Sequence, residues 1–103
     1  EGIGYYGCLL IKKEDYVHHH IRETADAIFY EGRTEEAISY MVSSLSKITL
    51  NINSEYVLID LLLKEHRIKD AIERLKMLMG VFPKDESVKN YLEQLQAIDK
   101  TGK

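Results

Sequence analysis

The segment Gly32-Arg-Thr-Glu-Glu-Ala-Ile38 is matched by His66-Arg-Ile-Lys-Asp-Ala-Ile72, which lies 34 positions further along the chain. The two segments share the arginine, an acidic residue before alanine, the alanine and the isoleucine. The same offset also pairs apolar residues on both sides of the match: Ile28 with Leu62, Met41 with Leu75, Leu45 with Met79, and Ile48 with Phe82. An apolar pattern kept through two helix-length segments indicates an internal repeat with this period.

Outward from the matched segments, apolar residues recur at three- and four-residue spacing, the pattern of a helix with one buried face. The spacing predicts five helices, over residues 21–30, 34–48, 57–63, 68–79 and 88–98. Residues 5–14 are a further helical candidate, although Gly4 and Gly7 each cost roughly 1 kcal/mol against alanine in a helix interior.

Glycine, proline and capping residues indicate where these helices begin and end. Gly32 is expected to end the first helix and Thr34 to cap the start of the second. Gly80 and Pro83 are expected to end the fourth helix, and Asp85 to cap the last. The expected organisation is therefore two helical hairpins followed by one more helix.

With this repeat, the chain resembles the tetratricopeptide repeat (TPR) family over about residues 18–100. Two sets of residues stand on the family's pattern: Leu58, Leu62, Ala71, Leu75 and Pro83 in the second copy, and Ala25, Ile28, Ala37 and Met41 in the first. The chain departs from the pattern where Thr49 replaces the closing proline and Ile59 a small residue, and it contains no tryptophan. An ordinary helical bundle with two similar hairpins is the alternative.

The resemblance implies an all-α fold in which antiparallel helical hairpins stack as a short right-handed α-solenoid with a C-terminal capping helix. It implies a single domain over residues 1–103. The expected parts are a first repeat at 17–50, a second at 52–83, a capping helix at 84–100, and the end of a preceding repeat at 1–16. Because the sequence begins at Glu1 without methionine, we expect a piece of a longer protein.

Composition narrows the class of protein. With 103 residues, of which 45% are hydrophobic and 30% charged, the chain suits one globular domain. The net charge of −3 argues against nucleic-acid binding, and the apolar runs are too short to span a membrane. Cys8 is the sole cysteine, so no intrachain disulfide can form, and a reducing, cytoplasmic location is the expectation.

No constellation in the sequence indicates catalysis, a metal or a cofactor. The run His18-His19-His20 does not suit a metal, because consecutive helical residues point about 100° apart. Cys8 lies among apolar residues, where a thiol is normally inert, and the acidic pairs Glu35-Glu36 and Asp85-Glu86 fall at helix starts, which the helix dipole explains. The sequence therefore predicts a protein that is not an enzyme.

In the TPR family the first helix of each repeat lines a concave groove that holds a peptide or partner helix. The resemblance places eight candidate partner-binding residues there: Arg22, Asp26, Phe29, Tyr30, Asn53, Tyr56, Asp60 and Leu63. Asp26 and Asp60 stand where the subtype that clamps acidic tails has asparagine, so the implied ligand is apolar with basic residues.

Two functions follow as hypotheses. The first is a non-catalytic scaffold or adaptor module that binds a protein or peptide. The alternative is a self-association domain of a larger enzyme or envelope protein, forming a homo-oligomer through an apolar N-terminal contact. The residues expected in that contact are Tyr5, Tyr6, Leu9, Leu10 and Ile11.

Overall fold

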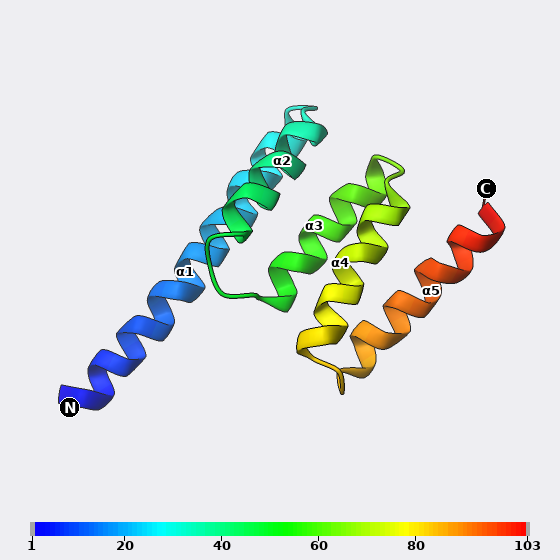
Figure 1. Cartoon of the computed structure of the whole chain (residues 1–103). Coiled ribbons are helices and arrows are strands. Elements are labelled where there is room, and N and C mark those ends of the chain that lie inside the picture. The colour runs from blue at the N-terminus through cyan, green and yellow to red at the C-terminus, as the bar shows by residue number, and fades with distance from the viewer. Residues whose placement is uncertain (1, 103) are drawn as a thin grey trace. The chain divides into compact units, whose positions relative to one another are not determined.

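A computed structural model describes the backbone of residues 2–102 and the side chains of residues 13–100. The described chain is helical and contains no strand, which confirms the all-α prediction. Five helices follow one another along the chain (Figure 1): α1 (Gly2–Tyr30), α2 (Thr34–Leu45), α3 (Ile52–Lys64), α4 (Ile68–Val81) and α5 (Glu86–Gly102).

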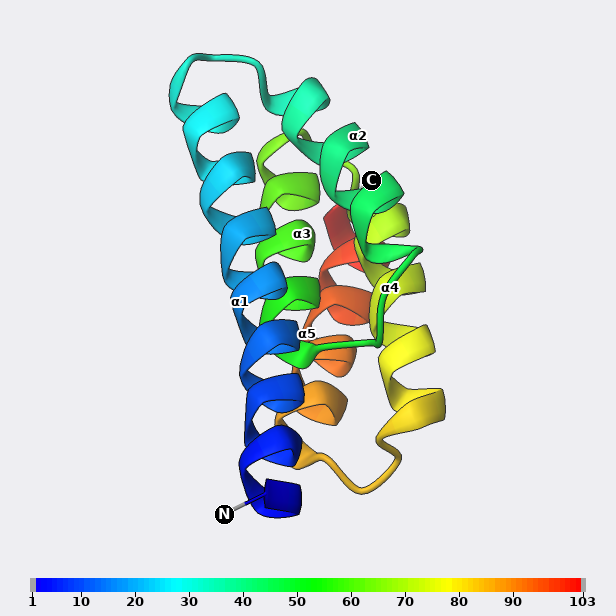
Figure 2. The ribbon, with the colours of Figure 1, turned by 90° about the vertical axis from the view of Figure 1, so that its left-hand side faces the viewer.

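The chain divides into two compact units, residues 1–54 and 55–103, and each is described by itself. In the first unit α1 and α2 pack as an antiparallel hairpin. In the second unit α3 and α4 form a hairpin, and α5 returns antiparallel to α4 and packs against it (Figures 1 and 2).

The cores of both units consist of the predicted helix faces. Ala37 and Ala71, one repeat apart, are both completely buried. A residue without a long side chain lets the two helices of a hairpin approach closely at that point. The other buried apolar side chains of the first unit are Ile21, Ala25, Ile38, Met41 and Leu45; those of the second include Leu58, Leu61, Leu62, Ile72, Leu75, Leu78, Val88 and Leu95.

A buried ion pair joins α3 to α4. Arg74 donates two hydrogen bonds to Glu55, from Nε to Oε1 at 2.8 Å and from Nη2 to Oε2 at 2.7 Å. The Glu55 side chain is only 2% exposed, so both carboxylate oxygens find their partners within the protein. Such two-point pairing fixes the geometry of a buried carboxylate.

Both hairpin turns have the same hydrogen bonds, displaced along the chain by one repeat. In the first, the N–H groups of Gly32 and Arg33 donate to the carbonyl oxygens of Phe29 and Ile28, at 2.9 and 3.2 Å. In the second, those of His66 and Arg67 donate to Leu63 and Leu62, at 3.0 and 2.8 Å. The shared arginines also have nearly equal backbone angles, φ −107° and ψ 59° at Arg33 against φ −98° and ψ 61° at Arg67.

The N-terminal segment differs from the expectation. α1 is one continuous helix of 29 residues, so residues 2–16 belong to the same helix as the start of the first expected repeat. A separate helix, as the end of a preceding repeat would be, is not formed there. Gly4 and Gly7 do not interrupt α1, because once a helix has begun, each added residue gains a backbone hydrogen bond.

Two of the expected helix ends also differ. Arg33, not Thr34, occupies the N-cap position of α2, and its side chain makes no capping hydrogen bond. Gly80 lies within α4, which ends at Val81, two residues before Pro83. The expected cap at Asp85 is confirmed, since its Oδ1 accepts a hydrogen bond from the Val88 N–H at 3.0 Å.

Candidate partner-binding site

The four candidate residues on α1 have different surroundings. Arg22 is half-buried and its Nη1 donates to Ser54 Oγ at 2.9 Å, so this guanidinium already has a structural partner. Phe29 is half-buried, and the centroids of its ring and the Tyr30 ring lie 5.4 Å apart. Asp26 and Tyr30 are exposed one turn apart on one face, with Tyr30 81% exposed. These two are the α1 candidates that solvent reaches most freely.

On α3 the candidates Tyr56, Asp60 and Leu63 follow one another at helical spacing, so they share a face. Tyr56 is half-buried and packs edge-to-face on Tyr91 of α5, with the ring centroids 5.6 Å apart. Asp60 is exposed and accepts a hydrogen bond from Lys64 Nζ at 2.7 Å, and Leu63 is half-buried. The fourth candidate on α3, Asn53, is exposed and belongs to the first unit.

Asp60 lies on the same face of α3 as Tyr56, which packs on Tyr91 of α5. Burial raises the pKa of the Tyr91 phenol, and the negative charge of Asp60 raises it further, followed by the effect of Tyr56. The pKa of Tyr56 is itself raised by burial and by the charge of Asp85. The face of α3 that carries Tyr56 and Asp60 is therefore turned towards α5.

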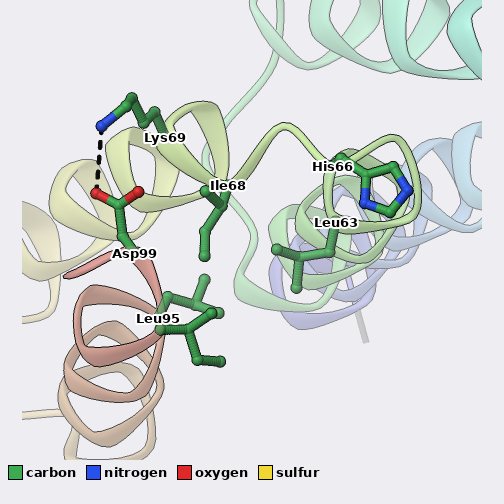
Figure 3. A pocket seen from close by; sticks show the side chains of 7 residues that line it. Leu63, His66, Ile68, Lys69, Leu95 and Asp99 are labelled. Carbon is green, nitrogen blue, oxygen red and sulfur yellow. Dashed lines mark hydrogen bonds and ion pairs between the residues drawn. The ribbon is translucent and has the colours of Figure 1, made fainter. Parts of the chain in front are cut away.

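Where this face reaches the end of α3, the second unit has a hollow of about 760 Å³ (Figure 3). Its lining residues come from three helices and the turn between α3 and α4: Leu63, His66, Ile68, Lys69, Leu95, Ile98 and Asp99. At its rim, Lys69 Nζ of α4 and Asp99 Oδ2 of α5 form an ion pair at 3.3 Å. The hollow thus combines an apolar lining with a charged rim.

Of the residues that line the hollow, the sequence identified Leu63 alone. The others belong to the turn, to the start of α4 and to the second half of α5, and no motif links these segments. One signal was present in the sequence, since Ile98 extends the apolar face of an otherwise polar last helix. In the structure, Ile98 is 53% exposed.

The first unit contains a buried polar network around His18. His18 Nε2 donates to the Thr49 carbonyl oxygen at 2.9 Å, so in the neutral ring Nδ1 accepts from the Ser54 hydroxyl, also at 2.9 Å. Ser54 Oγ in turn accepts from Arg22. A serine bonded to a histidine is also the arrangement of a nucleophile and its base, but Ser54 is completely buried and His18 is 2% exposed. We interpret the network as structural, because a substrate cannot reach Ser54 Oγ.

Neither a metal cluster nor a membrane span is found in the described part of the chain. Among side chains 13–100, no three of His, Cys, Asp and Glu are placed to share a metal ion. His19 forms an exposed contact with Glu23 at 3.4 Å on the same helix. Within the described residues, no helix has the length and apolar content needed to cross a membrane. Cys8 lies outside the described side chains.

Comparisons of the chain with protein-family models, with curated proteins and with solved structures gave no match.

Proposed function

We propose that the chain is a non-catalytic protein-interaction module of tetratricopeptide-like architecture, a scaffold or adaptor domain that works in the cytoplasm. Its ligand is an apolar peptide or partner helix that carries a basic residue. The observation that carries the proposal is the hollow of the second unit. Leu63 lines it, and Tyr56 and Asp60 lie on the same face of α3 as Leu63.

The equivalent turns support the repeat architecture. Two hairpins whose turn hydrogen bonds recur at the same offset as their sequences are built as copies of one unit, and stacking is how such units bury their apolar faces. The exposed residues of α5 support its role as the capping helix, because a cap presents a polar outer face. They include Lys89, Asn90, Glu93, Gln94 and Gln96.

The ligand chemistry follows from the lining and its surroundings. Leu63, Ile68 and Ile98 offer apolar surface to an inserted side chain, and burying one such side chain is worth about 1.5–3 kcal/mol. Asp60, one turn from Leu63, already pairs with Lys64, but an exposed pair four residues apart contributes only about 0.3–0.5 kcal/mol. A basic group of the ligand can therefore replace Lys64 at little cost.

A peptide array followed by titration tests this function. We expect apolar peptides with a basic residue to be captured in preference to acidic ones, and Ile98→Gln to weaken their binding about tenfold. Val81→Gln is the matched control, since Val81 is 54% exposed and does not line the hollow. Asp60→Asn should chiefly lower the preference for basic over neutral peptides, because charge selects partners more than it adds affinity.

Two outcomes would contradict the proposal. One is capture of acidic peptides in preference to basic ones. The other is equal loss of binding in Ile98→Gln and Val81→Gln, which would show that the hollow is not the site.

Self-association is the second candidate function, as part of a larger enzyme or envelope protein. The observation in its favour is the length of α1, 29 residues against 12 in α2, together with Tyr16, which is 70% exposed on α1. The residues expected in that contact, Tyr5, Tyr6, Leu9, Leu10 and Ile11, lie outside the described side chains. Light scattering tests this second candidate, since a self-association domain cannot be a monomer whereas a peptide receptor can.

A further inference from the structure

We infer that the hollow of the second unit also receives residues 5–13 of a second copy of this chain. The inference rests on the proposed function, because it assigns an occupant to the same site. It identifies that occupant as an apolar helix followed by two lysines, the same chemistry as the proposed ligand.

α1 is much longer than α2, its partner in the first hairpin. At 1.5 Å per residue, α1 extends about 43 Å and α2 about 18 Å. His18 bonds to Thr49, and Ile48 lies beside Lys13, Glu14 and Val17, so the loop that follows α2 reaches along α1 as far as Lys13. The part of α1 before that level extends beyond α2 (Figure 1). In the described part of its own unit, no other helix lies beside this stretch of α1.

The part of α1 that extends beyond α2 carries apolar residues at helical spacing. Tyr5, Leu9 and Lys12 are separated by four and three residues, as are Tyr6 with Leu10 and Lys13. In a helix such positions follow one another along one face. Each series has two apolar residues and then a lysine. Lys13, whose side chain lies within the described residues, is exposed.

The chemistry of this segment complements that of the hollow. Leu63, Ile68 and Ile98 supply apolar surface, and Asp60 stands one turn before Leu63 on α3. An apolar segment that ends in two lysines therefore meets apolar surface with an acidic residue beside it. Each copy carries one segment and one hollow, so a reciprocal exchange between two copies would fill both hollows in a dimer.

Site-specific crosslinking tests the contact directly, because Cys8 lies within the segment and is the sole cysteine. The unmodified chain is mixed with a mass-tagged chain that carries Cys8→Ser and Ile98→Cys, and a short thiol-reactive bifunctional crosslinker is added. The matched control is a tagged chain with Cys8→Ser and Val81→Cys, since Val81 and Ile98 are 54% and 53% exposed. We expect the mixed dimer to form at least about tenfold faster with Ile98→Cys. Equal rates for the two would overturn the inference.

The mass of the chain in solution gives an independent measurement. We expect a dimer whose dissociation constant rises about tenfold in Ile98→Gln and in Leu10→Gln, and does not change in Val81→Gln. A monomer at all accessible concentrations would also overturn the inference.

The failure of this inference can be told from the failure of the proposed function. If the crosslinks show no preference while external basic peptides bind and lose affinity in Ile98→Gln, the hollow is a peptide site and the second copy is not its occupant. If neither the peptides nor the segment distinguishes Ile98→Gln from Val81→Gln, both proposals fail.

Discussion

Gly32 and His66 occupy the same position in two equivalent turns, and both have positive φ, 85° and 61°. They lie one repeat apart, and the N–H of each donates to a carbonyl three residues earlier. Glycine adopts this left-handed conformation at no steric cost, whereas a residue with Cβ pays roughly 1–2 kcal/mol. The second hairpin therefore contains backbone strain that the first does not.

His66→Gly should stabilise the chain by about 1 kcal/mol, because it relieves this strain while the turn stays the same. Gly32→Ala should destabilise it by a similar amount, although a Cβ at Gly32 would meet no atom within 4 Å, since the conformation alone opposes the substitution. Denaturant midpoints, measured at one pH, decide both.

Gly80→Ala is the control for the glycine substitution. Gly80 also has open space around it, but it lies within α4, where alanine is favoured over glycine by about 0.5–1 kcal/mol. The same chemical change should therefore stabilise at Gly80 and destabilise at Gly32. If both glycine variants shift the midpoint in the same direction, the turn conformation is not what Gly32 provides.

Ala71→Leu should destabilise the chain by about 1–3 kcal/mol, because Ala71 is completely buried in the second hairpin and a larger side chain overpacks it. Lys69→Ala, on the same helix, should cost at most about 1 kcal/mol, since it removes only the exposed pair with Asp99. Urea unfolding of the two variants measures the difference. An Ala71→Leu variant as stable as the parent would show that the two helices do not meet closely at this position.

These two predictions concern features that the sequence already indicated. The repeat offset located both turns, and alanine at 37 and 71 located two completely buried positions, because local spacing and side-chain size carry that information. The residues at which helices begin were harder to predict from the sequence. Thr34 was expected to cap α2, but the backbone turn at Arg33 begins the helix without any side-chain cap.

The candidate site was predicted only in part, because it depends on which helices become neighbours. The spacing along α3 put Tyr56, Asp60 and Leu63 on one face, as the structure has them. That Tyr56 packs on Tyr91 follows from the way α5 returns along the second unit, and no pattern within α3 encodes it. Likewise, the resemblance predicts that Arg22 faces a ligand. In the structure its guanidinium donates a hydrogen bond to Ser54, which is distant in the sequence.

Ser54→Ala should destabilise the chain by about 1–3 kcal/mol, because it leaves His18 Nδ1 without a donor and removes the hydroxyl that accepts from Arg22. His18 is buried, so water does not readily replace the lost bond. Ser87→Ala, at an exposed position of α5, is the matched control and should change stability by less than about 0.5 kcal/mol. Thermal or urea unfolding measures the stability of both variants. Equal stability of Ser54→Ala and Ser87→Ala would show that the network does not stabilise the fold.

Tyr91 should make the chain lose stability in alkali. The folded-state pKa of its phenol is raised, first by burial and then by the charge of Asp60, while in the unfolded chain the phenol titrates near its ordinary pKa of about 10. Below that pH both states are protonated and the stabilisation is fully present. As the pH rises through about 10 towards the folded-state pKa, the unfolded state loses its proton first, so the free energy of unfolding falls.

Tyr91→Phe should therefore lose less stability than the parent between pH 8 and pH 10.5. Asp60→Asn should also reduce the loss, because it removes a charge that opposes ionisation of Tyr91. Urea midpoints at the two pH values measure the loss, and Tyr30→Phe, at a tyrosine that is 81% exposed, controls for the removal of one phenol. Lysines lose their charge in the same range, so the difference between variant and parent is the informative quantity. An equal alkaline loss in Tyr91→Phe, Tyr30→Phe and the parent would show that Tyr91 of α5 is not buried against α3.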